Sequence, residues 1–204
     1  MSNHKYSRMG SLGNNVMDRF ALAAPPCVVR AAGHALFWPI ACSQYIMTKL
    51  GIFQWFSEVY ISEKSGGRII LGGLPWPEAT RQALLKDEHV TAVINLVSEK
   101  SFPFKVEKRL DIPLEDFAHP KTTDVAPALE FLDEAIKEGR TVYVHCRAGK
   151  GRSATVAMCW LVSRLGMTPE SAQEFLERKR PQILNNLYSR DVVREFFKNR
   201  RISK

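Results

Sequence analysis

The stretch TVYVHCRAGKGRSATVAMCWLV, residues 141–162, joins two apolar runs through a short loop that carries a thiol and three cations. The first run, TVYVH (141–145), has the length and composition of a buried strand in a parallel sheet. The second run (153–165) is apolar on nearly every face, which predicts a helix in the middle of the domain. Gly149 and Gly151 permit the tight curl that so short a loop requires. The stretch therefore predicts a strand–loop–helix unit at the centre of the fold.

Further strands and helices are expected to alternate around this unit. Short apolar runs bounded by glycine or charged residues predict strands, and apolar residues at three- and four-residue spacing predict helices. This alternation is typical of an α/β fold, and we expect a central, mostly parallel sheet flanked by helices. The expected strands are 68–73, 91–97 and 108–114; the expected helices are 77–87, one capped by Thr122 or Thr123 and ended by Gly139, one that opens at Thr168, and one over 189–199.

The loop after the central strand has the chemistry of a phosphate-binding site. In a tight loop at a helix N-terminus, backbone N–H groups point inward and form an anion cradle about the size of a phosphate. Cys146 lies in the same positive field, which lowers the pKa of its thiol and predicts a thiolate at neutral pH. Arg152 can hold two phosphate oxygens with its planar fork. The predicted phosphate-binding residues are Arg147, Ala148, Gly149, Lys150, Gly151 and Arg152.

Two neighbours complete the predicted reaction centre. Ser153 can donate a hydrogen bond to the sulfur of Cys146, which eases departure of the thiolate in the second chemical step. His145, directly before the nucleophile, is expected to orient the loop through hydrogen bonds. Together these residues predict attack of a thiolate on a phosphomonoester through a cysteinyl-phosphate intermediate. This chemistry requires neither a metal ion nor a cofactor.

The leaving alkoxide needs a proton, so an acid is expected across from the thiolate. If the strand before Asp116 runs parallel to the strand before Cys146, both residues lie at the same edge of the sheet, where open α/β sheets place their sites. Asp116 is therefore the predicted general acid, and as a carboxylate it can activate water for the second step. Asp111 and Glu115 are the competing candidates. Asp124 falls at a helix start, where capping explains it.

Composition and charge limit the possible partners. The chain has 204 residues, of which 45% are hydrophobic and 25% charged, as in a globular domain with a sizeable core. Its net charge of +8 suggests an anionic partner: nucleic acid, an acidic membrane surface or a phosphorylated substrate. The sequence has no zinc-finger spacing, aromatic RNA-binding motif or basic helix, so nucleic acid is not expected. Four cysteines without a C-x-x-C pair indicate neither a zinc site nor a disulfide framework.

The N-terminal segment 1–57 differs from the rest of the chain. It is basic, with Asp18 as its one acidic residue, and this bias resembles a transit peptide. Its apolar run ALFWPIACSQYIM is interrupted and borderline in length for a membrane-spanning helix, which favours a peripheral anchor; a helix that covers the domain is the alternative. We expect a targeting and membrane-association segment over 1–57 and a catalytic domain over 58–204. The aromatic residues expected at the interface are Phe37, Trp38 and Tyr45.

The motif H-C-x-x-G-x-x-R-S, with an aspartate loop before it, resembles the signature of the cysteine-dependent dual-specificity phosphatases of the protein tyrosine phosphatase superfamily. The stretches ALFWP, IILGGLPW, VYVHCRAGKGRSAT and TPESAQEFLERKRPQI are similar to the branch that dephosphorylates phosphatidylglycerophosphate in mitochondria. The resemblance runs from about Ala35 to the last helix. It implies that Cys146 is the nucleophile, Arg152 the phosphate binder and Asp116 the acid.

The same resemblance implies a phosphorylated lipid substrate, phosphatidylglycerophosphate, whose dephosphorylation feeds cardiolipin synthesis. It also implies a protein held at the mitochondrial inner membrane on the matrix side. The sequence departs from that branch at VSEKSFPF (97–104), where those enzymes carry an acidic, tyrosine-containing stretch. The loop with Lys150 and Gly151 is also similar to that of phosphoinositide phosphatases. A phosphatase of phosphoproteins or phosphoinositides, and a binding module that captures phosphorylated ligands without turnover, are the alternatives.

Overall fold

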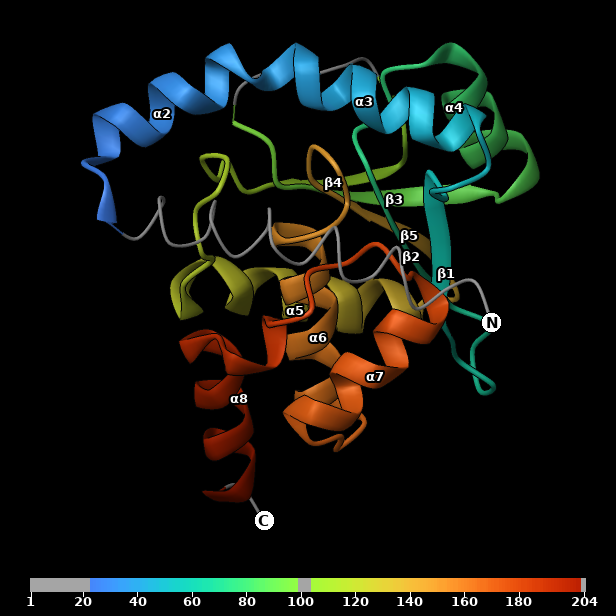
Figure 1. Ribbon diagram of the computed structural model, residues 1–204. Coiled ribbons are helices and arrows are strands. Elements are labelled where there is room, and N and C mark those ends of the chain that lie inside the picture. Colours follow the sequence, from blue (N-terminus) through green and yellow to red (C-terminus); the bar gives the residue numbers. More distant parts are fainter. Residues whose placement is uncertain (1–22, 99–103, 203–204) are drawn as a thin grey trace, which may run out of the picture.

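The computed structural model describes residues 23–98 and 104–202, which form a central sheet flanked by helices (Figure 1). The sheet has five strands in the order β1-β2-β5-β3-β4. Four of them run parallel, and only β1 is antiparallel to its neighbour β2. The expected mostly parallel sheet is therefore confirmed. The strands are β1 (Phe56–Ile61), β2 (Arg68–Gly72), β3 (Val90–Asn95), β4 (Lys108–Asp111) and β5 (Thr141–His145).

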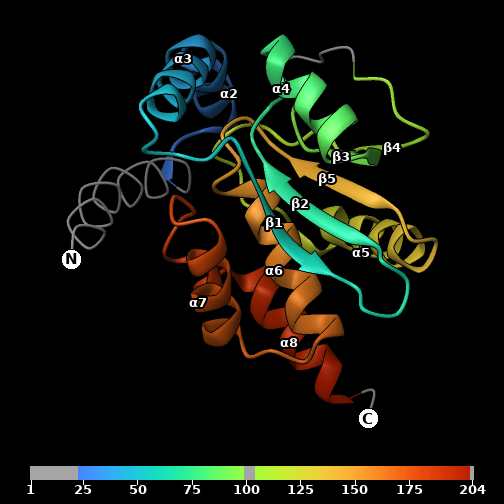
Figure 2. The same cartoon turned by 90° about the vertical axis from the view of Figure 1, so that its right-hand side faces the viewer.

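Helices cover both faces of this sheet and the edge where its parallel strands end (Figures 1 and 2). α5 and α6 lie on one face, with α7 and α8 packed against α6, while α4 lies on the other face. The arrowheads of β2 and β5 point towards α2 and α3 in Figure 2. The helices are α2 (Pro26–Ala35), α3 (Phe37–Lys49), α4 (Glu78–Gln82) with its continuation η1 (Ala83–Asp87), α5 (Thr122–Lys137), α6 (Arg152–Arg164), α7 (Pro169–Lys179), the short η2 (Leu187–Ser189) and α8 (Asp191–Ile202).

Alternate residues of the inner strands are buried on opposite faces of the sheet. In β5, Val142 and Val144 pack into the core shared with α5 and α6, whereas Tyr143 packs into the smaller core under η1. Burial on both faces is what the uninterrupted apolar run of β5 predicts, because a parallel strand has helices on either side. α6 is buried at every position from its first residue to Val162, which confirms the expected central helix.

β4 and α5 differ locally from the expectation. β4 ends at Asp111, two residues before Pro113, instead of running to Leu114. α5 begins with Lys121 as its N-cap, and the carboxylate of Asp124 accepts the Lys121 backbone N–H at 2.8 Å. Neither Thr122 nor Thr123 is the N-cap, whereas the capping role expected of Asp124 is confirmed.

The first strand was not expected at all. β1 begins at Phe56, so the boundary expected at residue 57 falls inside a strand of the sheet. Its alternating pattern is short and only half buried, which gives a weak strand signal in the sequence.

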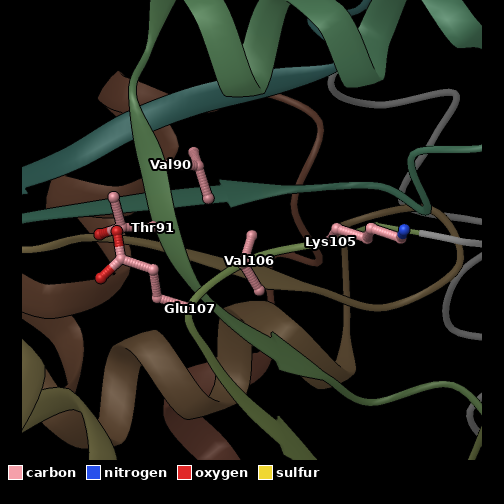
Figure 3. Close-up of a pocket in the computed structure, with 5 residues that line it drawn as sticks. All are labelled: Val90, Thr91, Lys105, Val106 and Glu107. Carbon is pink, nitrogen blue, oxygen red and sulfur yellow. The ribbon is translucent and has the colours of Figure 1, made fainter.

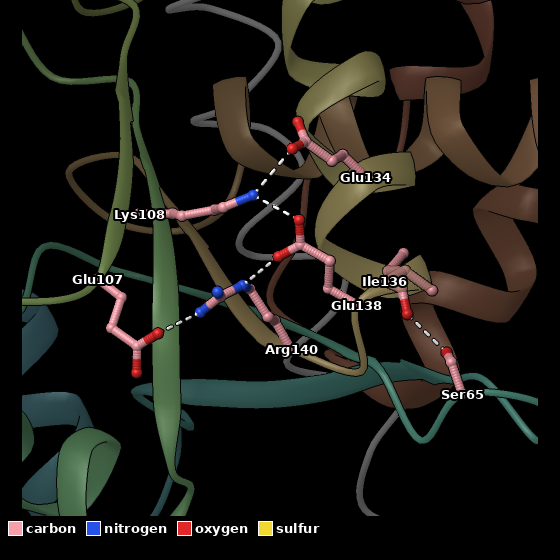
Figure 4. Close-up of polar contacts among 7 residues, drawn as sticks. All are labelled: Ser65, Glu107, Lys108, Glu134, Ile136, Glu138 and Arg140. Carbon is pink, nitrogen blue, oxygen red and sulfur yellow. Dashed lines mark hydrogen bonds and ion pairs between the residues drawn. The ribbon is translucent and has the colours of Figure 1, made fainter.

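Ion pairs fasten the edge of the sheet where the parallel strands begin (Figure 4). Lys108 at the start of β4 donates to Glu134 of α5 and to Glu138 at its C-cap, at 2.8 and 2.6 Å. Glu138 also pairs with Arg140, whose guanidinium reaches Glu107. Hydrogen bonds from Arg140 and Lys108 lower the pKa of Glu138 to about 2, so the network stays charged at neutral pH. α5 is thereby tied to β4 and to the start of β5.

A pocket of about 300 Å³ opens at this same edge (Figure 3). Its walls come from the start of β3 and from the segment that leads into β4. Parallel strands begin at one edge and end at the other, so this pocket and the loop after β5 lie at opposite edges of the sheet. The lining residues are Val90, Thr91, Lys105, Val106 and Glu107.

Candidate active site

Cys146 follows the last residue of β5, and the loop after it returns directly into α6. Its side chain is buried, with 3% of the residue exposed. Gly149 in the loop has a φ of +68°, a left-handed conformation that favours glycine. A Cβ at this position would also overlap the carbonyl group of Gly72 at the end of β2. The loop is therefore curled against the neighbouring strand, as the two glycines of the sequence predict.

The surroundings of Cys146 favour its thiolate. Burial by itself raises the pKa of the thiol, but the charge of Arg152 and hydrogen bonds from Ser153 and from the Gly149 backbone outweigh it, so the pKa is lowered overall. The Ser153 hydroxyl lies 3.3 Å from the Cys146 sulfur. This is the contact that the sequence predicts for these two residues.

His145 is neutral in this setting. Burial lowers the pKa of its imidazole to about 3, and its ring stacks on Tyr143 with a centroid distance of 5.4 Å. A group with so low a pKa does not exchange protons near neutral pH. The expected role of His145 in orienting the loop through hydrogen bonds stays a prediction.

Asp116 meets Arg152 at the loop, although the two residues are 36 positions apart. The Arg152 guanidinium donates to the Asp116 carboxylate and to the carbonyl oxygens of Leu96 and Leu114, the latter at 3.2 and 2.6 Å. These carbonyls follow β3 and β4, so Arg152 binds together the ends of the parallel strands. Asp116 is 8% exposed and therefore lies inside the site rather than on its rim.

The competing acids lie elsewhere. Asp111 accepts hydrogen bonds from Asn95 and Arg109, both at 2.7 Å. Glu115 forms an ion pair with Arg30 of α2 at 2.9 Å. Asp116 is therefore the candidate that the structure brings to the cysteine loop, and the other two have partners of their own.

The two remaining loop cations contact groups outside the cysteine loop. Arg147 is 3% exposed, and its guanidinium pairs with Asp116 and donates to the Gly33 carbonyl oxygen at 3.0 Å. The Lys150 ammonium lies 4.1 Å from the centre of the Phe53 ring. Burial and the nearby charge of Arg180 lower the pKa of Lys150 to about 8. The role of Arg147, Ala148, Gly149, Lys150 and Gly151 in binding the substrate phosphate stays a prediction.

Arg180 supports the cysteine loop by hydrogen bonds to its backbone, and the sequence analysis did not identify it. It is fully buried, and its guanidinium donates to the Gly149 carbonyl oxygen at 2.8 Å and to the Gln54 carbonyl oxygen at 3.0 Å. Burial lowers its pKa to about 10, so it remains a cation at neutral pH. In the sequence, Arg180 looks like one of several basic residues at the end of α7. Nothing in that local pattern distinguishes it from its exposed neighbours.

A buried cysteine whose thiol pKa is lowered, an arginine fork and a facing carboxylate at the end of a parallel sheet define the active site of a cysteine-dependent phosphatase. The family model for the dual specificity phosphatase catalytic domain matches residues 74–199. The chain therefore belongs to the dual-specificity phosphatases, as its signature motif predicts.

Several characterised relatives share this domain. The chain is 33% identical to phosphatidylglycerophosphate phosphatase PTPMT1 of Arabidopsis thaliana over 80% of its own length and 49% of that protein, so it spans about half of that relative. It is 32% identical to the human phosphatidylglycerophosphatase and protein-tyrosine phosphatase 1, over 64% of this chain and 70% of the human protein. The crystal structure of PTPMT1 in complex with PI(5)P has the same fold, with a TM-score of 0.60 and 24% identity over 74% of this chain and 99% of that one.

Proposed function

We propose that this protein is a phosphatidylglycerophosphate phosphatase that works through a cysteinyl-phosphate intermediate. The observation that carries the proposal is the convergence of Cys146, Ser153, Arg152 and Asp116 at one edge of the sheet. In these residues the site has a nucleophile, a hydrogen bond for the departing sulfur, a phosphate binder and an acid.

The geometry supports a two-step reaction. The Cys146 thiolate attacks phosphorus, the bond from phosphorus to the leaving oxygen breaks, and Asp116 gives that oxygen its proton. Water then attacks phosphorus, Asp116 takes a proton from it, and the sulfur–phosphorus bond breaks to release inorganic phosphate. The Ser153 hydroxyl stabilises the departing thiolate. Arg152 turns its fork from Asp116 to two phosphate oxygens when substrate binds.

The N-terminal helices support a lipid substrate. α3 and its C-cap residue Leu50 expose apolar side chains beside the edge where the site lies: Trp38 is 45% exposed, Ile46 55% and Leu50 65%. Asp18 is the one acidic residue before Glu58, so the segment of sequence that carries these apolar groups is basic. Such a surface suits an anionic membrane interface. In the part of the chain that the structure describes, no helix combines the length and hydropathy needed to span a membrane.

The names of the relatives support the same substrate. The plant and human relatives named above are phosphatidylglycerophosphate phosphatases, and PTPMT1 was crystallised with a phosphoinositide. We place this protein at the matrix side of the mitochondrial inner membrane, with the segment 1–57 serving in targeting and membrane association. The basic composition of that segment and its exposed apolar face support this assignment.

Phosphate release from several substrates tests the proposal. The full chain is incubated with phosphatidylglycerophosphate, phosphoinositides and a phosphotyrosine peptide, with the lipids in matched micelles, and kcat/KM is compared. We expect a strong preference for phosphatidylglycerophosphate and no turnover by Cys146→Ser. Residual turnover by that variant would refute covalent catalysis by this thiol.

A phosphoprotein substrate is the second candidate, because the human relative is also named a protein-tyrosine phosphatase. Comparable kcat/KM for the peptide and the lipid in the same assay would favour it.

A further inference from the structure

Arg147 connects the N-terminal helices to the residue proposed as the general acid. Its guanidinium donates to the Gly33 carbonyl oxygen of α2 at 3.0 Å and forms an ion pair with Asp116. The same group lies between two aromatic rings, 5.8 Å from the centre of Phe37 and 5.4 Å from that of Phe117. One buried side chain thus contacts α2, the start of α3 and the acid loop.

The contact with α2 has a clear physical basis. Carbonyl groups in the last turn of a helix have no partner within the helix, and they form the negative end of the helix dipole. Gly33 lies in the last turn of α2, which ends at Ala35. The guanidinium of Arg147 meets the helix end there and supplies both a donor and a positive charge. The end of α2 therefore holds Arg147 in place.

The contact with the acid loop has a second component. Phe117 directly follows Asp116 and has a φ of +63°, a strained conformation for a side chain of this size. Its ring packs against Arg147, while Glu115 on the other side of Asp116 pairs with Arg30 of α2. Both sequence neighbours of Asp116 are therefore connected to α2: Phe117 through Arg147, and Glu115 through Arg30.

Arg152 cannot hold Asp116 throughout the reaction. Its fork now donates to the Asp116 carboxylate, and the substrate phosphate requires the same donors. When phosphate occupies Arg152, the ion pair between Arg147 and Asp116 can persist. The acid loop then depends on Arg147 to keep Asp116 over the leaving oxygen.

We propose that Arg147 is a positioning residue that holds Asp116 over the leaving group, with the end of α2 and the ring of Phe37 as its support. The N-terminal helices are accordingly part of the catalytic unit as well as its membrane-facing surface. This inference rests on the assignment of Asp116 as general acid in the proposed function.

Leaving-group dependence tests the proposal with soluble substrates. An acid matters for an alkyl phosphate, whose alkoxide is a poor leaving group, and matters little for a nitrophenyl phosphate. We expect Arg147→Met to lower kcat for the alkyl phosphate by roughly 10–100-fold and kcat for the nitrophenyl phosphate by about twofold at most. Arg147→Lys, which keeps the charge but not the fork, is expected to recover part of the loss.

Two controls separate positioning from a purely structural role. Arg68→Met removes another ion-paired arginine, which binds Glu58 and Glu88 at the opposite edge of the sheet, and should leave the ratio of the two rates unchanged. Arg147→Met should have little further effect when Asp116 is already Asn, because a residue that acts through Asp116 loses its effect with it. Equal slowing of both substrates by Arg147→Met, or additive effects with Asp116→Asn, would overturn the proposal.

The failure of this inference can be told apart from failure of the proposed function. If Asp116→Asn slows both substrates equally, the general acid lies elsewhere, and both the assignment of Asp116 and the positioning role of Arg147 are refuted, while the proposed substrate and the role of Cys146 still stand. If Asp116→Asn slows the alkyl phosphate selectively and Arg147→Met does not, only the positioning role is refuted. Folding of each variant is checked by urea unfolding before the rates are compared.

Discussion

Ser153 is fully buried, and its hydroxyl lies 3.3 Å from the Cys146 sulfur. The hydrogen bond contributes to the lowered pKa of the thiol. We expect Ser153→Ala to raise that pKa, because a stabilising interaction with the thiolate is lost. Activity requires the thiolate and falls as the pH drops through the thiol pKa, so the acid limb of kcat/KM should shift to higher pH. The pH dependence of nitrophenyl phosphate hydrolysis measures this shift; an unmoved limb would contradict the role.

The same variant is expected to slow the second chemical step. Without the hydroxyl, the departing thiolate is less stabilised and the cysteinyl phosphate persists. Rapid-quench measurements should then show a burst of released alcohol followed by slow turnover.

His145 makes stability depend on pH. Its pKa is lowered to about 3 in the folded protein, from an ordinary value of 6.5. Between these values the unfolded chain binds a proton that the folded chain does not, so stability falls as the pH falls from about 6.5 towards 3, by roughly 1.4 kcal/mol per pH unit. His145→Gln should remove this contribution. Urea unfolding at pH 6.5 and 4.5 compares the two proteins, and the same pH dependence in both would show that His145 contributes nothing.

The conformation of the cysteine loop depends on its packing against β2 and on its hydrogen bonds with Arg180. Gly149→Ala would place a methyl group against the Gly72 carbonyl and would force a positive φ on alanine. We expect this variant to lose most of its activity and about 2 kcal/mol or more of stability.

Gly151→Ala is the matched control for that change. At this position a Cβ meets the flexible end of Leu184 at 3.3 Å, and φ is −110°. Nitrophenyl phosphate turnover and urea unfolding should therefore change much less than for Gly149→Ala. If the two variants behaved alike, the close approach to β2 would not be what shapes the loop.

The molecule as a whole is basic, and most of the exposed large apolar side chains among the described residues lie between Val28 and Ile52. The net charge is +8, and Ile46 and Leu50 are 55% and 65% exposed. The double variant Ile46→Asn with Leu50→Asn should weaken binding to anionic vesicles by roughly tenfold, since two apolar side chains no longer enter the interface. Hydrolysis of a soluble phosphate ester should be unchanged. Vesicle sedimentation measures the binding.

The control for vesicle binding uses exposed apolar residues on other elements. Ile61 and Leu165 are 51% and 45% exposed, and changing both to Asn should leave vesicle binding intact. Binding of the unchanged protein should weaken as salt is raised, because screening reduces the attraction between basic residues and anionic lipids. Equal loss in both double variants would assign membrane binding to the whole surface instead of to α3.

The strand–loop–helix unit and the family could be recognised from the sequence, which also predicts Cys146 as the nucleophile. These features are local: β5, the loop and α6 follow one another, so spacing and composition are enough to recognise them. The choice of Asp116 needed one topological rule, the parallel course of β4 and β5, and the strand order confirms that course.

The tertiary structure alone decided what holds these residues in place. Arg147 meets Gly33 from 114 positions away, and Arg180 meets Gln54 from 126 positions away. β1 is part of the sheet through its antiparallel pairing with β2, although the alternation of buried and exposed residues in β1 is weak. Contacts across such distances arise when the chain packs, because burying a guanidinium requires that its donors find carbonyl or carboxylate partners. The order of residue types along the chain does not specify which carbonyl or carboxylate groups will be the partners of a given arginine.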